Sequence, residues 1–186
     1  MDNQDKPTIS IKNKHTDDLI DHYWGSINYV SGLIKSSELK AGLLLSFYGI
    51  LLNFIFQSKG NLLDKFSNDI ILYILLGLLF SSIGASIYFS VRCFIPRIEG
   101  KYDKNIFFFG DVISKYGNIK EFSKTFYNVS INEDKLFEQL GEQIYINSKI
   151  ASWKFGNVNK AIRFLALALL LLLLLAVYYL IFTLVK

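Results

Sequence analysis

The sequence has few of the residues that most catalytic and metal sites use. It has one cysteine and two histidines among 186 residues, so neither a disulfide framework nor a cysteine metal cage can form within one chain. No pair of acidic residues joins His15 and His22 at the spacing of metal ligands. The sequence also lacks the GxGxxG, P-loop and HExxH motifs. We therefore predict no catalytic residues, no metal, no cofactor, and a protein that is not an enzyme.

Charge is scarce as well. Charged residues make up 19% of the chain, against about 25% in an average soluble domain. Hydrophobic residues make up 52%, and the mean hydropathy is +0.32, which excludes an intrinsically disordered chain. The polar N-terminus, MDNQDKPTIS, lacks the apolar segment of a cleaved signal peptide. The apolar residues are concentrated in three blocks, which indicates a membrane protein rather than an ordinary soluble domain.

The three blocks predict an all-α membrane protein with three transmembrane helices. Residues 164–185 carry no charge, and at 1.5 Å per residue they would reach about 33 Å, enough to cross a hydrocarbon core. Residues 70–91 are equally long and uncharged, and Arg92 follows them. Residues 41–56 are short for a span, but Lys40 and Gln57 can extend the run at its two ends. A re-entrant segment is the alternative for this first block.

Lysine and arginine counts predict the orientation of the spans. Five lie before the first block, two in residues 57–69, twelve in residues 92–163, and one after the third block. Because cytoplasmic segments carry an excess of these residues, we expect the N-terminus inside and the C-terminus outside. The expected order is a cytoplasmic segment and helix at 1–40, spans at 41–57, 70–92 and 164–185, an extracytoplasmic loop at 58–69, and a helical cytoplasmic domain at 93–163.

Two long helices are expected to enter the membrane directly from the cytoplasm. Apolar residues recur at helical spacing over residues 17–56, with Thr16 as the N-cap. The same spacing runs from Leu136 into the third block, after Ser130 and Glu133 in the pattern of a capping box. A shorter helix is expected at residues 119–127. A packing change in the cytoplasm would then have a rigid route into the bilayer.

The first two blocks each carry a face of small and polar residues. Such residues let helices approach closely, and their hydroxyls and amides form hydrogen bonds between helices. Two interpretations are open: packing of the first span on the second within one chain, or contacts between subunits that line a water path in a homo-oligomer. The residues are Gly42, Ser46, Gly49 and Asn53 in the first block, and Gly77, Ser81, Ser82, Ala85 and Ser86 in the second.

Several stretches resemble a bacterial family of membrane effectors. SELKAGLLLSFYGILL, at residues 37–52, is similar to a motif of the form A-D-x-K-A followed by leucines and a glycine. FFGD at 108–111, QLGEQIYINSKIASWKF at 139–155, and the order of two spans, a helical insert and a third span are similar too. On these features the chain resembles the membrane effectors of Pycsar anti-phage systems over most of its length. Glu38 stands where the pattern has aspartate, so the acid is retained with one methylene more.

The resemblance implies a partner cyclase that makes cyclic CMP or cyclic UMP on infection. The effector would sense this nucleotide through residues 93–163 and impair the inner membrane, which leads to growth arrest or cell death. Its partners would be membrane lipids, the nucleotide and further copies of the chain, with no nucleic acid. Twelve bases against eight acids in residues 92–163 suit an anionic ligand. A non-enzymatic membrane scaffold and a holin-like toxin that needs no ligand are the alternatives.

Two groups of residues are expected to carry the response. At the membrane edge we expect Lys35, Glu38 and Lys40 to couple the two regions, with an ion pair between Glu38 and Lys40; Lys40 could instead only mark the headgroup boundary. Contacts to the nucleotide are expected from Lys, Arg and aromatic residues, because phosphate favours cations and a base favours an aromatic face. A solvated helix face is their alternative role. The candidates are Arg97, Tyr145, Lys149, Trp153 and Lys154.

Overall fold

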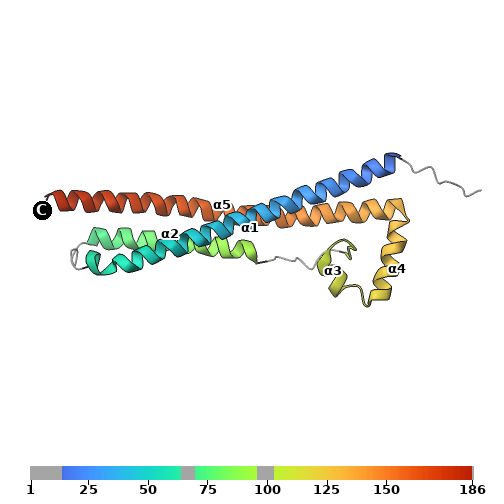
Figure 1. Ribbon diagram of the computed structural model, residues 1–186, viewed down its shortest axis with the longest axis horizontal. Coiled ribbons are helices and arrows are strands. Elements are labelled where there is room, and N and C mark those ends of the chain that lie inside the picture. The colour runs from blue at the N-terminus through green and yellow to red at the C-terminus, as the bar shows by residue number, and fades with distance from the viewer. Residues whose placement is uncertain (1–13, 64–69, 96–102, 186) are drawn as a thin grey trace, which may run out of the picture. The chain divides into compact units, whose positions relative to one another are not determined.

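The computed structural model describes residues 14–63, 70–95 and 103–185, and these form five helices and no strand. Three of the helices are long and apolar enough to cross a membrane, which confirms the all-α membrane class. Contacts divide the chain into two units, and the boundary falls inside the first and the last helix. The helices are α1 (Lys14–Leu63), α2 (Ile70–Phe94), α3 (Phe109–Ser114), α4 (Ile119–Ser130) and α5 (Glu133–Val185) (Figure 1).

The apolar unit is a three-helix bundle built from residues 31–100 and 148–186. At one level of this bundle Ala41, Cys93 and Val158 pack together. At a second level Tyr48 packs on Leu79, Ile83, Ala168 and Leu171. Residue numbers rise along α1 and α5 between the two levels and fall along α2. α2 is therefore antiparallel to α1 and α5, as the ribbons show (Figure 1).

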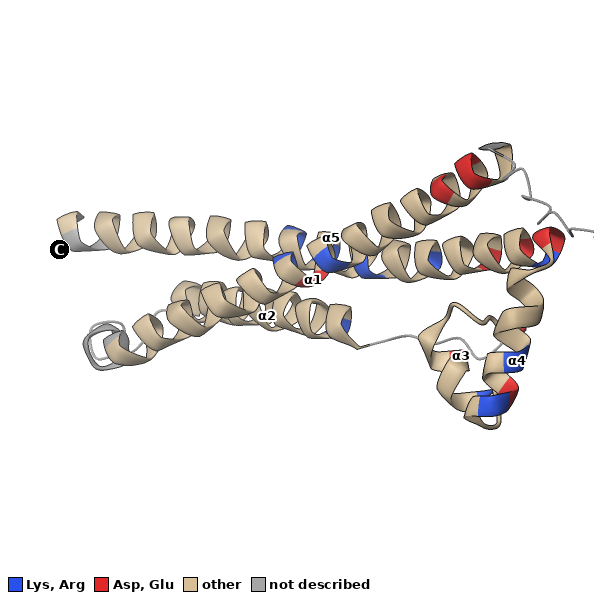
Figure 2. Ribbon diagram, turned by 45° about the vertical axis from the view of Figure 1, so that its right-hand side comes forward, with Lys and Arg blue, Asp and Glu red and all other residues tan. Residues whose placement is uncertain are grey.

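Several serine hydroxyls in this apolar bundle donate to backbone carbonyls. Ser46 donates to the carbonyl oxygen of Gly42, and Ser81 donates to that of Gly77. Both acceptors lie one turn earlier on the same helix, so these polar side chains need no partner from another helix. Most of α2 and the last part of α5 carry no charged residue (Figure 2). In these stretches the bundle can therefore lie in lipid without exposing a charge or an unpaired backbone N–H or C=O group.

The second unit contains the beginning of α1 and residues 103–147. α4 begins after Asn118, whose side chain accepts hydrogen bonds from the backbone nitrogens of Lys120 and Glu121. α5 begins after Asn132, whose side chain accepts from the nitrogen of Lys135 at 3.0 Å. These asparagines satisfy backbone donors that a helix leaves free in its first turn. The predicted helix at 119–127 is confirmed and is longer than expected.

Both predicted N-caps are wrong. Thr16 lies inside α1, which begins at Lys14, and its hydroxyl donates to Glu133 Oε1 at 3.1 Å. Ser130 is the last residue of α4, and Asn132 caps α5 in its place. The capping-box pattern correctly predicted that a helix begins near residue 133. Its first residue, Ser130, cannot be the N-cap of α5 because it belongs to the last turn of α4.

The two long helices are unbroken, as predicted. α1 passes through residues 41–57 without interruption, as a spanning helix requires and a re-entrant segment does not. It also continues to Leu63, so the first part of the predicted loop at 58–69 is helical. α2 ends at Phe94, two residues before Pro96. The predicted loop residues 64–69 lie outside the described residues.

Candidate functional site

A hydrogen-bond network centred on Asn105 organises the second unit. None of the Asn105 surface is exposed, and its Nδ2 donates to the carbonyl oxygen of Gln139 at 2.7 Å and to Glu142 Oε2 at 3.2 Å. Its Oδ1 accepts from the backbone nitrogens of Phe107 and Phe108. Gln139 completes the network, since its Nε2 donates to Glu142 Oε2 at 2.8 Å and its Oε1 accepts from the nitrogen of Ile106. A buried network in which every member is satisfied holds its surroundings rigidly.

Asp111 extends this network toward α3. Its Oδ2 accepts from the backbone nitrogen of Asn105 at 3.0 Å, and its Oδ1 lies 3.0 Å from Lys115 Nζ. The preceding residue, Gly110, leaves room for a folded-back ring, because a Cβ there would lie 2.9 Å from the Phe108 side chain. The FFGD stretch and the beginning of the 139–155 stretch therefore meet in one buried cluster.

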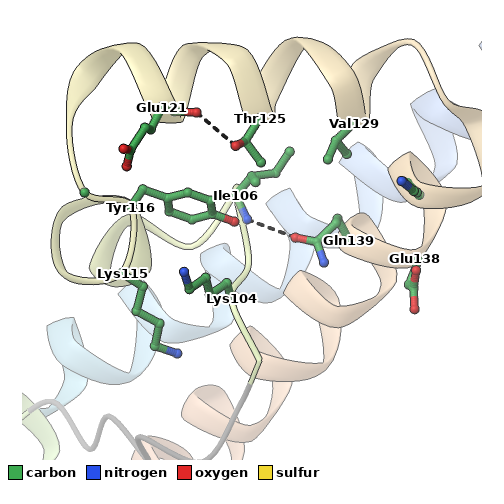
Figure 3. A pocket seen from close by; sticks show the side chains of 11 residues that line it. Lys104, Ile106, Lys115, Tyr116, Glu121, Thr125, Val129, Glu138 and Gln139 are labelled. Carbon is green, nitrogen blue, oxygen red and sulfur yellow. Dashed lines mark hydrogen bonds between the residues drawn. The ribbon is translucent and has the colours of Figure 1, made fainter.

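A cavity of about 590 Å³ lies beside this network. Its volume falls in the range of about 300–1,000 Å³ that is usual for small-molecule sites. Three lysines and two glutamates contribute to its wall, together with one aromatic residue and the Gln139 side chain (Figure 3). We call it the lysine-lined cavity. Its lining residues are Lys104, Ile106, Lys115, Tyr116, Gly117, Glu121, Thr125, Val129, Lys135, Glu138 and Gln139.

Tyr116 places an aromatic ring in this cavity. The ring lies between the Glu121 carboxylate and the Lys104 ammonium (Figure 3), and Lys104 Nζ is 5.9 Å from the ring centroid. Burial raises the pKa of the Tyr116 hydroxyl above its usual 10.0, and the negative charges of Asp111 and Glu142 raise this pKa further. The phenol is therefore neutral at physiological pH and can donate a hydrogen bond. The cavity thus offers lysine ammonium groups, an aromatic face, a neutral donor and carboxylate acceptors.

Aromatic rings connect the cavity to α1 within this unit. Tyr116 packs edge-on against Phe122, with ring centroids 5.6 Å apart, and Phe122 contacts Phe126 at 5.8 Å. Phe126 contacts Phe107 at 6.0 Å, and Phe107 meets the Trp24 ring of α1 at 5.6 Å. These separations are those of favourable aromatic pairs. A displacement of Tyr116 would therefore be felt at α1 through direct contacts.

An ion pair in the apolar unit joins all three of its helices. Lys154 of α5 is 5% exposed, and its Nζ lies 2.7 Å from Glu38 Oε1 of α1 and 2.8 Å from the carbonyl oxygen of Cys93 at the end of α2. An almost buried ammonium is stable only with such partners. Residue 154 lies in the 139–155 stretch and residue 38 in the 37–52 stretch, so these two stretches of the sequence also meet in the fold.

Comparison with known proteins shows the family of this chain. The family described as the Pycsar effector protein domain matches residues 22–181. The chain belongs to this family. A protein of Propioniciclava tarda named Pycsar effector protein PtPycTM is 26% identical over 157 aligned positions, and the match covers 82% of this chain and 76% of that protein. No solved structure matches the chain. Membership confirms the resemblance seen in the sequence and supports a role as a membrane effector in anti-phage defence.

The predicted coupling pair of this Pycsar effector is wrong in its partner. Glu38 pairs with Lys154 and not with Lys40, which lies with its Nζ 5.2 Å from the centroid of the Phe155 ring. Residues two apart point to different sides of a helix, so Glu38 and Lys40 cannot face each other. Lys35 is exposed on α1. A coupling role of these residues stays a prediction.

The described residues among the predicted nucleotide contacts do not line the lysine-lined cavity. Tyr145, Lys149 and Trp153 follow one another at four-residue steps along α5, while the ammonium of Lys154 is turned into the bundle. Arg97 lies outside the described residues. A contact of any of these five predicted residues with a ligand stays a prediction. The sequence analysis missed the lysine-lined cavity, because its residues come from three separate segments that only the folded chain brings together.

The small-residue faces divide between the two interpretations. Ser82 and Ser86 are buried in the bundle, and Ser86 Oγ donates to the carbonyl oxygen of Ala161 on α5 at 2.7 Å, so this row packs within the chain. The face of α1 does not, because its buried residues are Ser37, Ala41, Leu44 and Tyr48. At 100° per residue these four are centred about 140° around the helix from the predicted face. The partly or fully exposed small and polar residues are Gly42, Ser46, Gly49, Asn53, Gly77, Ser81 and Ala85.

Proposed function

We propose that this Pycsar effector senses cyclic CMP or cyclic UMP from a partner cyclase and then impairs the inner membrane. The observation that carries the proposal is the form of α1 and α5. Each is one helix that includes a polar stretch with charged residues and an apolar stretch long enough to cross a membrane. A ligand bound to the second unit, which contains the beginning of α1 and residues 103–147, can therefore act on residues in the bilayer through continuous helices. Family membership supports the direction of this argument.

The proposal includes an orientation of the chain in the membrane. With three spans the two ends of the chain lie on opposite sides, and the excess of Lys and Arg in residues 92–163 favours the cytoplasm for this segment. The N-terminus and the α3–α4 region then face the cyclase product, and the C-terminus is extracytoplasmic. The exposed small and polar face of α1 supports assembly into homo-oligomers, since such faces are where membrane helices associate.

The mechanism follows from differential binding. A nucleotide shifts an equilibrium between two helix packings only as far as its affinities for them differ. In the resting packing Glu38, Lys154 and the Cys93 carbonyl hold α1, α5 and α2 together. In the active packing this junction loosens and the apolar helices associate between subunits into a leak.

Dye-filled liposomes with the purified full chain test the proposal. We expect dye release on addition of cyclic CMP or cyclic UMP, and none with cyclic AMP or with linear CMP at the same concentration. Release without nucleotide would indicate the holin-like toxin instead. No release under any of these conditions would contradict the proposal and favour a scaffold.

A further inference from the structure

The lysine-lined cavity has two ammonium groups that the described part of the chain does not neutralise. Lys115 is held by the Asp111 carboxylate at 3.0 Å. Lys104 lies over the Tyr116 ring, and neither Lys104 nor Lys135 forms an ion pair with a described carboxylate. Both are exposed side chains with room to reach a ligand. A phosphodiester is the anion that such ammonium groups bind well.

The opposite side of the Tyr116 ring carries the Glu121 carboxylate (Figure 3). This carboxylate lies against Gly117, where an added Cβ would be only 2.5 Å from Glu121 Oε2. The carboxylate can only accept hydrogen bonds, so it favours a ligand group that donates an N–H bond. Among the pyrimidines cytosine presents an amino group, whereas uracil presents a carbonyl oxygen in its place. A glutamate that accepts from this amino group is a known way to select cytosine.

Two other polar side chains of the cavity wall already have partners, and the Glu138 carboxylate points away from the Tyr116 ring (Figure 3). Gln139 uses both ends of its amide in the Asn105 network, and the Thr125 hydroxyl donates to the carbonyl oxygen of Glu121. Selection of the base therefore falls to Glu121, and the rigid network keeps the Gln139 side of the wall in place. A preformed wall reduces the ordering that binding would otherwise require.

We propose that the lysine-lined cavity binds the cyclic nucleotide, with Lys104 and Lys135 at the phosphate and Glu121 at the amino group of cytosine. This inference rests on the proposed function and adds its site and its base preference. Cyclic CMP is then the preferred activator over cyclic UMP.

The test measures binding of labelled cyclic CMP and cyclic UMP to the full chain in detergent. We expect the wild-type protein to prefer cyclic CMP by about tenfold, as one good base contact allows. Lys104→Met and Lys135→Met should each weaken both nucleotides by about tenfold through the lost charge-assisted contact. Glu121→Gln should abolish the preference, because an amide can donate to the uracil oxygen as well as accept from cytosine.

Matched control variants distinguish a loss of ligand binding at the cavity from a loss of folding. Lys124→Met removes an exposed lysine of α4 that does not line the cavity, and Asp134→Asn removes an exposed acid at the start of α5. Neither should change binding. Because the three test residues are also exposed, all variants should unfold at the wild-type temperature.

The outcomes distinguish this inference from the proposed function. A wild-type protein that binds neither nucleotide contradicts the proposed function itself. Binding that survives Lys104→Met and Lys135→Met as well as it survives Lys124→Met places the site elsewhere and overturns the inference. A wild-type preference for cyclic UMP, or an unchanged preference in Glu121→Gln, overturns the assignment of the base.

Discussion

Lys154 carries an ammonium into a region where few side chains can accept from it. Its two partners are the Glu38 carboxylate and the Cys93 carbonyl. The sequence predicted that Glu38 is important and that an ion pair forms at this level, but it could not predict the partner. Helical periodicity assigns residues to faces of one helix, whereas the partner lies on a helix more than a hundred residues later.

At the residue scale we expect Glu38→Gln to lower the free energy of unfolding by about 1–3 kcal/mol, because the Lys154 ammonium loses its charged partner. The Glu38 side chain is 39% exposed, which keeps the cost below that of a fully buried pair. Thermal unfolding in detergent measures it. Lys40→Met is the control and should cost less, because this substitution removes only the contact of Lys40 with the Phe155 ring.

The double variant completes this prediction. If the two side chains interact, Glu38→Gln with Lys154→Met should cost clearly less than the two single costs combined. Strictly additive costs would show that the pair contributes no stability, and a large effect of Lys40→Met would restore the pairing that the sequence suggested.

Tyr116 gives a second prediction at the residue scale. Burial and the charges of Asp111 and Glu142 raise the pKa of Tyr116 in the folded state. The folded protein therefore holds this proton more tightly than the unfolded chain does. The resulting stability is complete below the usual pKa of 10.0 and is lost as the pH rises through the higher folded-state pKa.

We expect the unfolding temperature of Tyr116→Phe to fall less steeply than that of the wild type as the pH rises beyond 10.0. Scanning calorimetry at a series of pH values measures the difference. Tyr127→Phe replaces an exposed tyrosine of α4 and should follow the wild-type curve. Parallel curves for wild type and Tyr116→Phe would show that this phenol does not contribute.

At the scale of the element, the beginning of α5 depends on Asn132. Asn132→Ala should lower the free energy of unfolding by about 1 kcal/mol, because the nitrogen of Lys135 loses its acceptor. Ser130→Ala should have a much smaller effect, since its hydroxyl does not cap α5. Chemical unfolding of both variants decides between the cap seen in the structure and the capping box expected from the sequence.

The small-residue faces of α1 and α2 show what helical periodicity can and cannot predict. It located the small residues, and it placed them correctly on common faces. It could not say which face packs inside the chain, because both an inner and an outer contact favour small residues in a membrane. The packed row is Ser82 and Ser86, where a hydroxyl meets the Ala161 carbonyl.

Two leucine substitutions separate these faces. Ser86→Leu should lower the free energy of unfolding by about 1–3 kcal/mol, because its site is full. Ser46→Leu should leave the unfolding temperature unchanged, since Ser46 is exposed. If the α1 face joins subunits, Ser46→Leu should nevertheless reduce nucleotide-triggered dye release from liposomes. Full release by this variant would contradict a subunit contact at Ser46.

At the scale of the whole molecule, the sequence predicted the number of spans and the continuity of the two long helices. Both follow from local properties, namely apolar length and the absence of proline over residues 14–63 and 133–185. The lysine-lined cavity and the Lys154 junction follow instead from contacts between distant segments. Such contacts leave no periodic trace in the chain, and for this reason they appeared only in the structure.

Cys93 gives this molecule a built-in reporter. It is the single cysteine of the chain, none of its surface is exposed, and it sits where Lys154 meets α2. A maleimide dye should therefore leave the resting protein unlabelled and react within minutes once an activating nucleotide separates the helices there. Labelling at equal rates with and without nucleotide would mean that the junction never opens. The wild-type protein, with no engineered position, would thus report the proposed opening in an intact membrane.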